Sequence, residues 1–290
     1  MTAPLLVRAD DGVELALWHA PPAGPPRSTA VLLVHGTFSN RRFFLGAGER
    51  GLARVLAERG YDAWVPELRG HGRSGALGRA QQWHFEDWIR RDAPAVVAGV
   101  RDHAGPERLV WIGHSAGGVI GLAFAGQGGP LARHVAGFVV AGAPAPLGLG
   151  PAQRPLALAG WLIARLVGRF PARALRIGPE DEHAGVFGQW MRWNLQRRWL
   201  GADGTDYFAN LCRVTAPVLA LAGGGDRLVA PAATCRGLLD ACGGADHTFV
   251  RCGRAEGFAE NYDHNRVLVS RGARTEVWPL IIAWLEQRFP

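Results

Sequence analysis

The sequence predicts an α/β fold in which a mostly parallel central sheet is flanked by helices, with a helical cap inserted after the sixth strand. Two observations predict this fold. Short apolar runs alternate with segments of helical spacing, as is typical of parallel sheets with crossover helices. Between residues 145 and 211 the helical patterns continue but no convincing strand is present. We therefore expect one domain, with residues 1–144 and 212–290 as the core and residues 145–211 as the cap.

The first part of the core is predicted to hold six strands and three helices. Asp10, Asp11 and Gly12 form a turn signal that joins the first two strands as a hairpin. The continuous apolar run at 30–34 is typical of a strand buried on both faces of a parallel sheet. The predicted strands are residues 5–8, 13–19, 30–34, 63–65, 108–112 and 135–141. The predicted helices are residues 51–59, 85–103 and 119–125.

The strand pattern resumes after the predicted cap. The apolar run at 217–222 predicts a strand. A helix, a strand and a long closing helix are expected to follow at residues 232–241, 247–251 and 274–288. The carboxyl ends of parallel strands lie at one edge of the sheet, and ligands bind at that edge in open α/β sheets.

Composition excludes several classes of function. Of the 290 residues, 48% are hydrophobic and 20% charged, which is ordinary for a globular protein with a sizeable core. The formal net charge is +7, and arginine is the source of all its Lys/Arg positive charge because the chain contains no lysine. These arginines are spread along the chain without a nucleic-acid motif, so we expect no nucleic-acid partner. The composition leaves the oligomeric state open.

The lack of a recognisable signal peptide or membrane span, together with the cysteine usage, favours a cytoplasmic location. No uncharged apolar stretch reaches the length of about 18 residues that a membrane span needs. The first residues lack the basic and apolar parts of a signal peptide. The four cysteines have no C-x-x-C spacing, so a metal site or redox pair is not expected.

The segment from Gly113 to Gly118 is the most informative about chemistry. It has the pattern G-x-S-x-G between an apolar strand and a helix, which is the context of a nucleophile elbow. Gly113 and Gly117 let strand and helix approach closely, and the backbone of the apex residue is expected to be strained. Ser115 is therefore predicted to be a nucleophile. The alternative is a glycine-rich turn whose serine caps the helix.

Three further groups of residues are expected at the same edge of the sheet. His35, Gly36, Thr37 and Phe38 follow the strand at 30–34. Asp226 follows the strand at 217–222, and His264 lies in the loop after the last strand. The order Ser, Asp, His along the chain is that of the α/β-hydrolases.

The chain resembles the α/β-hydrolase-fold serine hydrolases, in particular esterases, lipases and lysophospholipases. The similarity covers about residues 5–144 and 212–288. It rests on motifs at His35–Gly36, Arg69–Ser74, Gly113–Gly118, Gly225–Asp226 and Asp263–His264. The resemblance implies the α/β-hydrolase fold, a serine mechanism and a carboxylic ester as the substrate.

Chemistry gives each member of the expected triad a role. The neutral hydroxyl of Ser115 is a weak nucleophile and needs a base within hydrogen-bond reach. His264 is predicted to take the serine proton and return it to the leaving group. Asp226 is predicted to hold the imidazole tautomer and stabilise the imidazolium. His247 and His183 are the competing bases, but a histidine at the start of a strand, as at His247, lies at the wrong edge of the sheet.

The oxyanion hole is expected to consist of two backbone N–H groups. One comes from Ala116, directly after the nucleophile, and the other from Thr37. Phe38 is the alternative to Thr37, because the sequence leaves the register of that loop open.

No cofactor and no metal ion are expected. No G-x-G-x-x-G follows the first parallel strand, and no H-x-x-x-H or similar ligand spacing is present. A serine at the elbow, where haloalkane dehalogenases and epoxide hydrolases carry aspartate, argues against their chemistry.

The predicted cap indicates an apolar substrate pocket. It contains four tryptophans: Trp161, Trp190, Trp193 and Trp199. We expect Phe38, His114, Trp190 and Trp193 to line the pocket.

The apolar segment 156–167 and the arginines after it favour a cap whose aromatic face packs on the core while the arginines extend outward. The alternative is an amphipathic helix with a basic side, suited to weak attachment at a membrane surface.

The sequence favours a serine hydrolase that cleaves hydrophobic or lipid-like carboxylic esters. Two alternatives remain. The same triad also suits amide, thioester or C–C bonds and acyl transfer. The second alternative is a hydrolase-fold binding protein without catalytic activity.

Overall fold

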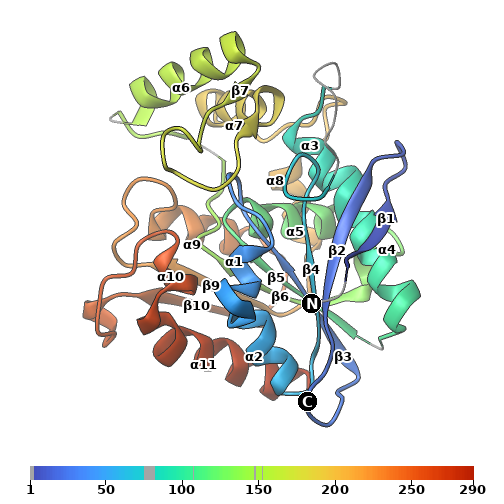
Figure 1. Cartoon of the computed structure of the whole chain (residues 1–290). Helices are drawn as coiled ribbons and strands as arrows, with labels where there is room; N and C mark the ends of the chain where they lie inside the picture. The colour runs from blue at the N-terminus through green and yellow to red at the C-terminus, as the bar shows by residue number, and fades with distance from the viewer. Residues whose placement is uncertain (1–2, 75–81, 107, 147, 152) are drawn as a thin grey trace.

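The computed structural model describes residues 3–74, 82–106, 108–146, 148–151 and 153–290. Its central sheet has eight strands in the order β1-β2-β4-β3-β5-β6-β9-β10 (Figure 1). The pairs β1–β2 and β2–β4 are antiparallel and the others parallel. The strands are β1 Leu5–Arg8, β2 Glu14–Ala20, β3 Thr29–Val34, β4 Asp62–Pro66, β5 Arg108–His114, β6 Val135–Ala141, β9 Val218–Gly223 and β10 His247–Cys252. The predicted α/β-hydrolase fold is confirmed.

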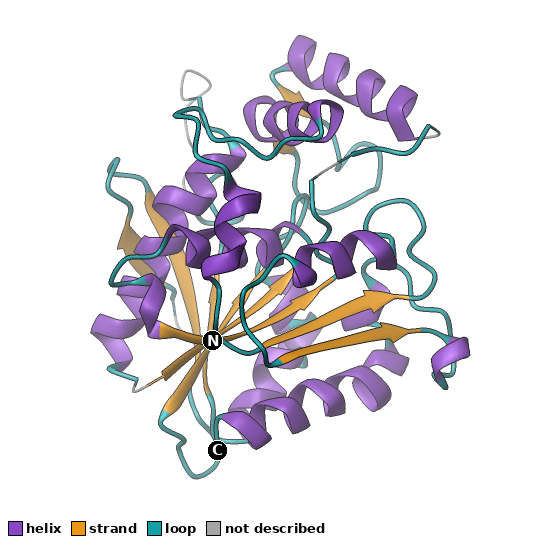
Figure 2. Ribbon diagram, turned by 180° about the vertical axis from the view of Figure 1, so that it is seen from behind, coloured by secondary structure: helices purple, strands orange, loops and turns teal. Residues whose placement is uncertain are grey.

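Helices cover both faces of this sheet (Figure 2). Along β3, Leu32 and Val34 join the core cluster under α4 and α5, whereas Val31 and Leu33 join the cluster under α2 and α11. Burial on both faces explains why β3 is a continuous apolar run. The helices are α1 Arg42–Leu45, α2 Leu52–Glu58, α3 Phe85–Asp87, α4 Ala93–Ala104, α5 Ala116–Gln127, α6 Gln153–Val167, α7 Ala184–Gln196, α8 Tyr207–Asn210, α9 Ala232–Asp240, α10 Arg266–Val269 and α11 Arg271–Arg288.

Three predicted helices differ by three or more residues from those observed, and the helix predicted at 119–125 spans Ala116–Gln127. The helix predicted at 85–103 is divided into α3, a π-helical turn at Trp88–Asp92, and α4. Pro94, which has no N–H to donate, lies in the first turn of α4. The closing helix α11 begins three residues earlier than predicted, because the Ser270 side chain accepts a hydrogen bond from the Ala273 N–H and caps it.

The segment predicted as a purely helical cap also contains two strands. β7 (Arg169–Phe170) and β8 (Glu182–His183) pair in an antiparallel manner between α6 and α7. Two residues are too few to show the alternating pattern by which a strand is detected in a sequence. The helices α6 and α7 pack against each other, away from the central sheet (Figure 1). The division of the chain into core and cap stays a prediction.

No helix among the described residues is long and apolar enough to cross a membrane.

Candidate active site

Ser115 lies at a strained turn between β5 and α5. Its backbone has φ 52° and ψ −123°, a conformation that residues other than glycine rarely adopt. A Cβ on Gly117 would lie 2.7 Å from the His35 carbonyl oxygen and would overlap the Val34 carbonyl oxygen. A Cβ on Gly113 would lie 2.5 Å from the Gly117 carbonyl carbon. The two glycines therefore permit the close approach that holds Ser115 at the apex.

A chain of hydrogen bonds joins Ser115, His264 and Asp226. The Nε2 atom of His264 lies 2.9 Å from Ser115 Oγ, and its Nδ1 atom lies 2.7 Å from Asp226 Oδ2. The Asp226 carboxylate also accepts hydrogen bonds from the N–H groups of Val229 and Ala230, at 3.0 and 3.1 Å. The structure thus brings together the three predicted triad residues, which are separated by up to 149 positions in the chain.

The surroundings of Asp226 keep its carboxylate charged. Burial alone would raise the pKa of Asp226. The hydrogen bond and charge of His264, together with the two backbone N–H donors, outweigh burial and lower that pKa below its ordinary value of 3.8. An ionised Asp226 can accept the Nδ1 proton of His264, which leaves Nε2 free to accept a proton from Ser115.

His114 contacts His264 and holds its backbone in place. The buried His114 ring stacks on Phe43 with 4.3 Å between centroids, and its Nε2 donates to the His264 carbonyl oxygen at 2.9 Å. Burial and the nearby His264 lower the pKa of His114 to about 3, so the ring is neutral. The prediction that His114 lines the pocket is wrong. As the last residue of β5, it packs against the ring of His264, with 4.8 Å between ring centroids.

The loop after β3 passes directly beside Ser115. A Cβ on Gly36 would lie 2.8 Å from Ser115 Cβ, so the backbone at this position has no room for a side chain. His35 fixes the loop: its Nδ1 donates to the Gly36 carbonyl at 2.8 Å, and its Nε2 accepts from the Leu68 N–H at 3.2 Å. Phe38 has φ 61°, and its carbonyl accepts from the Glu180 N–H at 3.1 Å.

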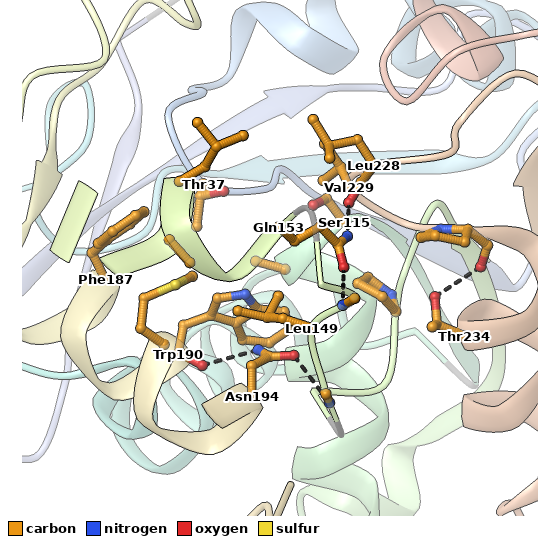
Figure 3. A pocket seen from close by; sticks show the side chains of 18 of the residues that line it. Thr37, Ser115, Leu149, Gln153, Phe187, Trp190, Asn194, Leu228, Val229 and Thr234 are labelled. Atoms are coloured by element: carbon orange, nitrogen blue, oxygen red, sulfur yellow. Dashed lines mark hydrogen bonds between the residues drawn. The ribbon is translucent and has the colours of Figure 1, made fainter. Parts of the chain in front are cut away.

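A cavity of about 640 Å³ opens at Ser115 (Figure 3). Thr37, Phe38 and Ala116 also line it. Most of the remaining lining is apolar, and Arg227 is the one charged residue among the described residues that line it. The cavity thus suits a largely apolar ligand whose reacting group lies at Ser115.

One face of α7 forms a wall of this cavity. Phe187, Trp190, Met191 and Asn194 line it, at the spacing i, i+3, i+4, i+7 of a single helix face. Figure 3 shows Phe187 and Trp190 facing the same cavity as Ser115. Phe187 was not predicted, although its spacing with Trp190 is a signal that would have found it.

Trp193 is not among the described residues that line the cavity, so its predicted place there is wrong. It lies on the neighbouring face of α7, is 2% exposed, and packs against Phe85, Trp199 and Tyr207. Its Nε1 donates to the Leu200 carbonyl at 2.7 Å. Trp193 therefore helps to attach α7 to the core.

The competing histidines lie elsewhere. His247 begins β10, at the opposite end of that strand from the sheet edge where Ser115 lies. His183 accepts a hydrogen bond from the Gly185 N–H at the start of α7 and stacks on Trp83. No group of three His, Cys, Asp or Glu side chains with the arrangement of a metal site is found in the described part of the chain.

Comparisons with known proteins support the fold described above. Residues 29–198 match the family model described as alpha/beta hydrolase fold. Human lipase member N is 30% identical over 112 residues, which are 36% of this chain and 28% of that protein, so the match spans less than a third of the relative.

Solved structures match over nearly the whole chain. An esterase from Thermogutta terrifontis has a TM-score of 0.62 and 18% identity, and the match covers 100% of both chains. A monoacylglycerol lipase from Paleococcus ferrophilus has a TM-score of 0.63 and 19% identity, over 94% of this chain and 99% of that one.

Proposed function

The chain belongs to the alpha/beta hydrolase fold family, and from that premise we propose that it is a serine hydrolase that cleaves carboxylic esters through an acyl-enzyme on Ser115. The observation that carries the proposal is the hydrogen-bonded chain Ser115–His264–Asp226, with distances of 2.9 and 2.7 Å, at a strained elbow. Esterases and lipases among the similar proteins support the choice of an ester bond.

Each step follows from these positions. Ser115 Oγ attacks the ester carbonyl carbon while His264 Nε2 takes the hydroxyl proton. The N–H of Ala116 and that of Thr37 or Phe38 stabilise the resulting oxyanion. His264 then returns the proton to the departing alcohol, and water hydrolyses the acyl-enzyme by the same route in reverse. The Asp226 carboxylate stabilises the imidazolium that forms in both halves.

The cavity supports a substrate with a hydrophobic acyl group. Aromatic and aliphatic side chains surround the space above Ser115, and burying a CH₂ group there stabilises the complex by about 0.8 kcal/mol. We expect kcat/KM to rise with acyl length until the cavity is filled.

Pre-steady-state kinetics with p-nitrophenyl butyrate test whether the protein cleaves esters through an acyl-enzyme. We expect a burst of p-nitrophenol that approaches one equivalent per enzyme, and no burst from Ser115→Ala. A folded wild-type protein that turns over thioester, amide or C–C substrates but no ester would favour the alternative bonds. A protein inert toward the whole panel would favour the binding protein without activity.

We also propose that α6 attaches weakly to an anionic membrane surface. Its buried residues are Gly160 and Ala164, whereas Leu162, Leu166 and Val167 are more than half exposed. Arg165 in α6 and Arg169, two residues after the end of α6, are exposed as well. Vesicle sedimentation tests attachment. Binding to phosphatidylglycerol vesicles should weaken as salt rises and should fall in a Leu162→Gln/Leu166→Gln variant. Equal binding by wild type and variant would contradict the proposal.

We propose a cytoplasmic location for the protein. The four cysteines are all free, as is usual in a reducing compartment. Fractionation of the native cell tests this location, and recovery of the protein from an oxidising compartment would contradict it.

A further inference from the structure

A second cavity, of about 360 Å³, lies outside the proposed active site. None of its described lining residues lines the catalytic cavity. It forms where three separate segments meet: the start of α1, the turn at residues 72–73, and the loop between β7 and β8. Its lining residues are Asn40, Arg41, Arg42, Gly72, Arg73, Arg173, Pro179 and Glu180.

Arginines dominate the charge of this cavity. Arg41 is neutralised by the buried Glu67 carboxylate, 2.9 Å from its Nη1. No carboxylate of a described residue lies within ion-pair distance of the guanidinium groups of Arg42, Arg73 or Arg173. Three guanidinium groups therefore lack a carboxylate partner while they share one concave site, an arrangement that attracts anions.

The only carboxylate among the described lining residues is already engaged. Glu180 Oε1 accepts a hydrogen bond from Asn40 Nδ2 at 2.5 Å. One carboxylate against three arginines without an acidic partner leaves two excess positive charges. The cavity lining thus retains its preference for an anion.

The backbone at two of these arginines is held in place. The Arg73 N–H donates to Glu67 at 2.9 Å, and the Arg173 N–H donates to Asp181 Oδ1 at 3.0 Å. The Arg73 guanidinium lies over the Trp18 ring, 5.4 Å from its centroid. Arginine presents a planar fork of donors that matches phosphate oxygens, and a fixed backbone reduces the entropy lost when those donors bind.

From these observations we propose that the cavity is a binding site for a phosphate group, carried by a soluble phosphate monoester or by a lipid headgroup. Arg42, Arg73 and Arg173 would donate to the phosphate oxygens from three segments that are distant in sequence. A bound phosphate would therefore connect the β7–β8 loop to α1 and to the 72–73 turn.

This site adjoins the loop beside Ser115. Glu180 lines the phosphate cavity, and its N–H donates to the Phe38 carbonyl, while Phe38 lines the catalytic cavity. Occupation of the site is thus expected to stabilise the loop that carries the proposed oxyanion donor. The binding itself is independent of the proposed ester hydrolysis.

Calorimetric titration of inorganic phosphate into the full chain, at constant ionic strength set with chloride, tests the proposal. We expect saturable binding, and a loss of about tenfold or more in affinity for Arg42→Gln/Arg173→Gln. Arg133→Gln/Arg213→Gln is the matched control, because it removes the same charge from exposed arginines outside this cavity. Circular dichroism of each variant shows that the fold is retained.

Two further titrations distinguish the sources of phosphate. Glycerol 3-phosphate represents a soluble monoester, and phosphatidic acid vesicles, compared with phosphatidylcholine vesicles, represent a lipid headgroup. Binding of either that weakens in the cavity variant but not in the control supports the site. If wild type binds none of the three phosphate probes, or if both double variants lose affinity equally, the proposal is wrong.

Discussion

Replacing Asp226 with Asn should reduce kcat by about 10⁴, or about 5.4 kcal/mol, the loss typical of a serine triad whose carboxylate becomes an amide. Three donors point at this carboxylate: Nδ1 of His264 and the N–H groups of Val229 and Ala230. An amide has one acceptor oxygen and no charge, so one orientation places its NH₂ against the Val229 N–H. The other orientation places the NH₂ against His264 and forces the ring proton onto Nε2, where it blocks proton transfer from Ser115.

Steady-state hydrolysis of a p-nitrophenyl ester measures the effect. Asp206→Asn is the matched control, because Asp206 also accepts a backbone N–H, that of Ala209 at 2.9 Å, at the start of α8. We expect the control to keep kcat within a factor of about two, because Asp206 is neither a member of the triad nor among the described residues that line the cavity. A folded Asp226→Asn enzyme with kcat within tenfold of wild type would refute the role given to this carboxylate.

Three further predictions concern the glycine at the elbow, a buried histidine–carboxylate pair, and the two tryptophans of α7. Gly117→Ala should destabilise the fold by about 3 kcal/mol, measured by urea unfolding, because the new methyl group overlaps a carbonyl of β3; an unchanged midpoint would contradict this. Burial opposes charge on His71, but the Glu182 carboxylate, 3.3 Å away, outweighs it and raises the pKa of His71 above 6.5. The stability from this pair is therefore complete below pH 6.5 and lost as pH rises through the raised pKa. Glu182→Gln should abolish that loss in unfolding measured across pH, and an unchanged profile would refute it. Trp190→Ala should shift the ester preference to longer acyl chains, whereas Trp193→Ala should lower the free energy of unfolding by about 3–5 kcal/mol without that shift. The reverse pattern would contradict the assignment of Trp190 to the cavity and Trp193 to the core.

The fold and the triad could be predicted because local constraints determine them. Gly113 and Gly117 have no room for a Cβ, so the elbow is visible as a short motif. Asp226 follows a buried parallel strand and His264 follows the last strand, and parallel strands bring their carboxyl ends to one edge of the sheet. Sequence order was therefore enough to place these side chains near Ser115.

The cavity lining could not be predicted as well, because it depends on how α7 is rotated against the core. Trp190 and Trp193 are three positions apart, yet one lines the cavity and the other fills the core. Composition alone does not separate them. The contact between Glu180 and Phe38 joins residues 142 positions apart through a loop with no regular pattern, so only the folded chain reveals it.

Labelling with a fluorophosphonate tests the central proposal, the nucleophilic role of Ser115, most directly. We expect intact-mass analysis to show a single adduct on wild-type protein, peptide mapping to place it on Ser115, and Ser115→Ala to remain unlabelled. The His264→Ala variant should be labelled much more slowly than wild type, because the Ser115 hydroxyl then lacks the base that takes its proton. A correctly folded wild-type protein that stays unlabelled, or an adduct on a different residue, would contradict the account.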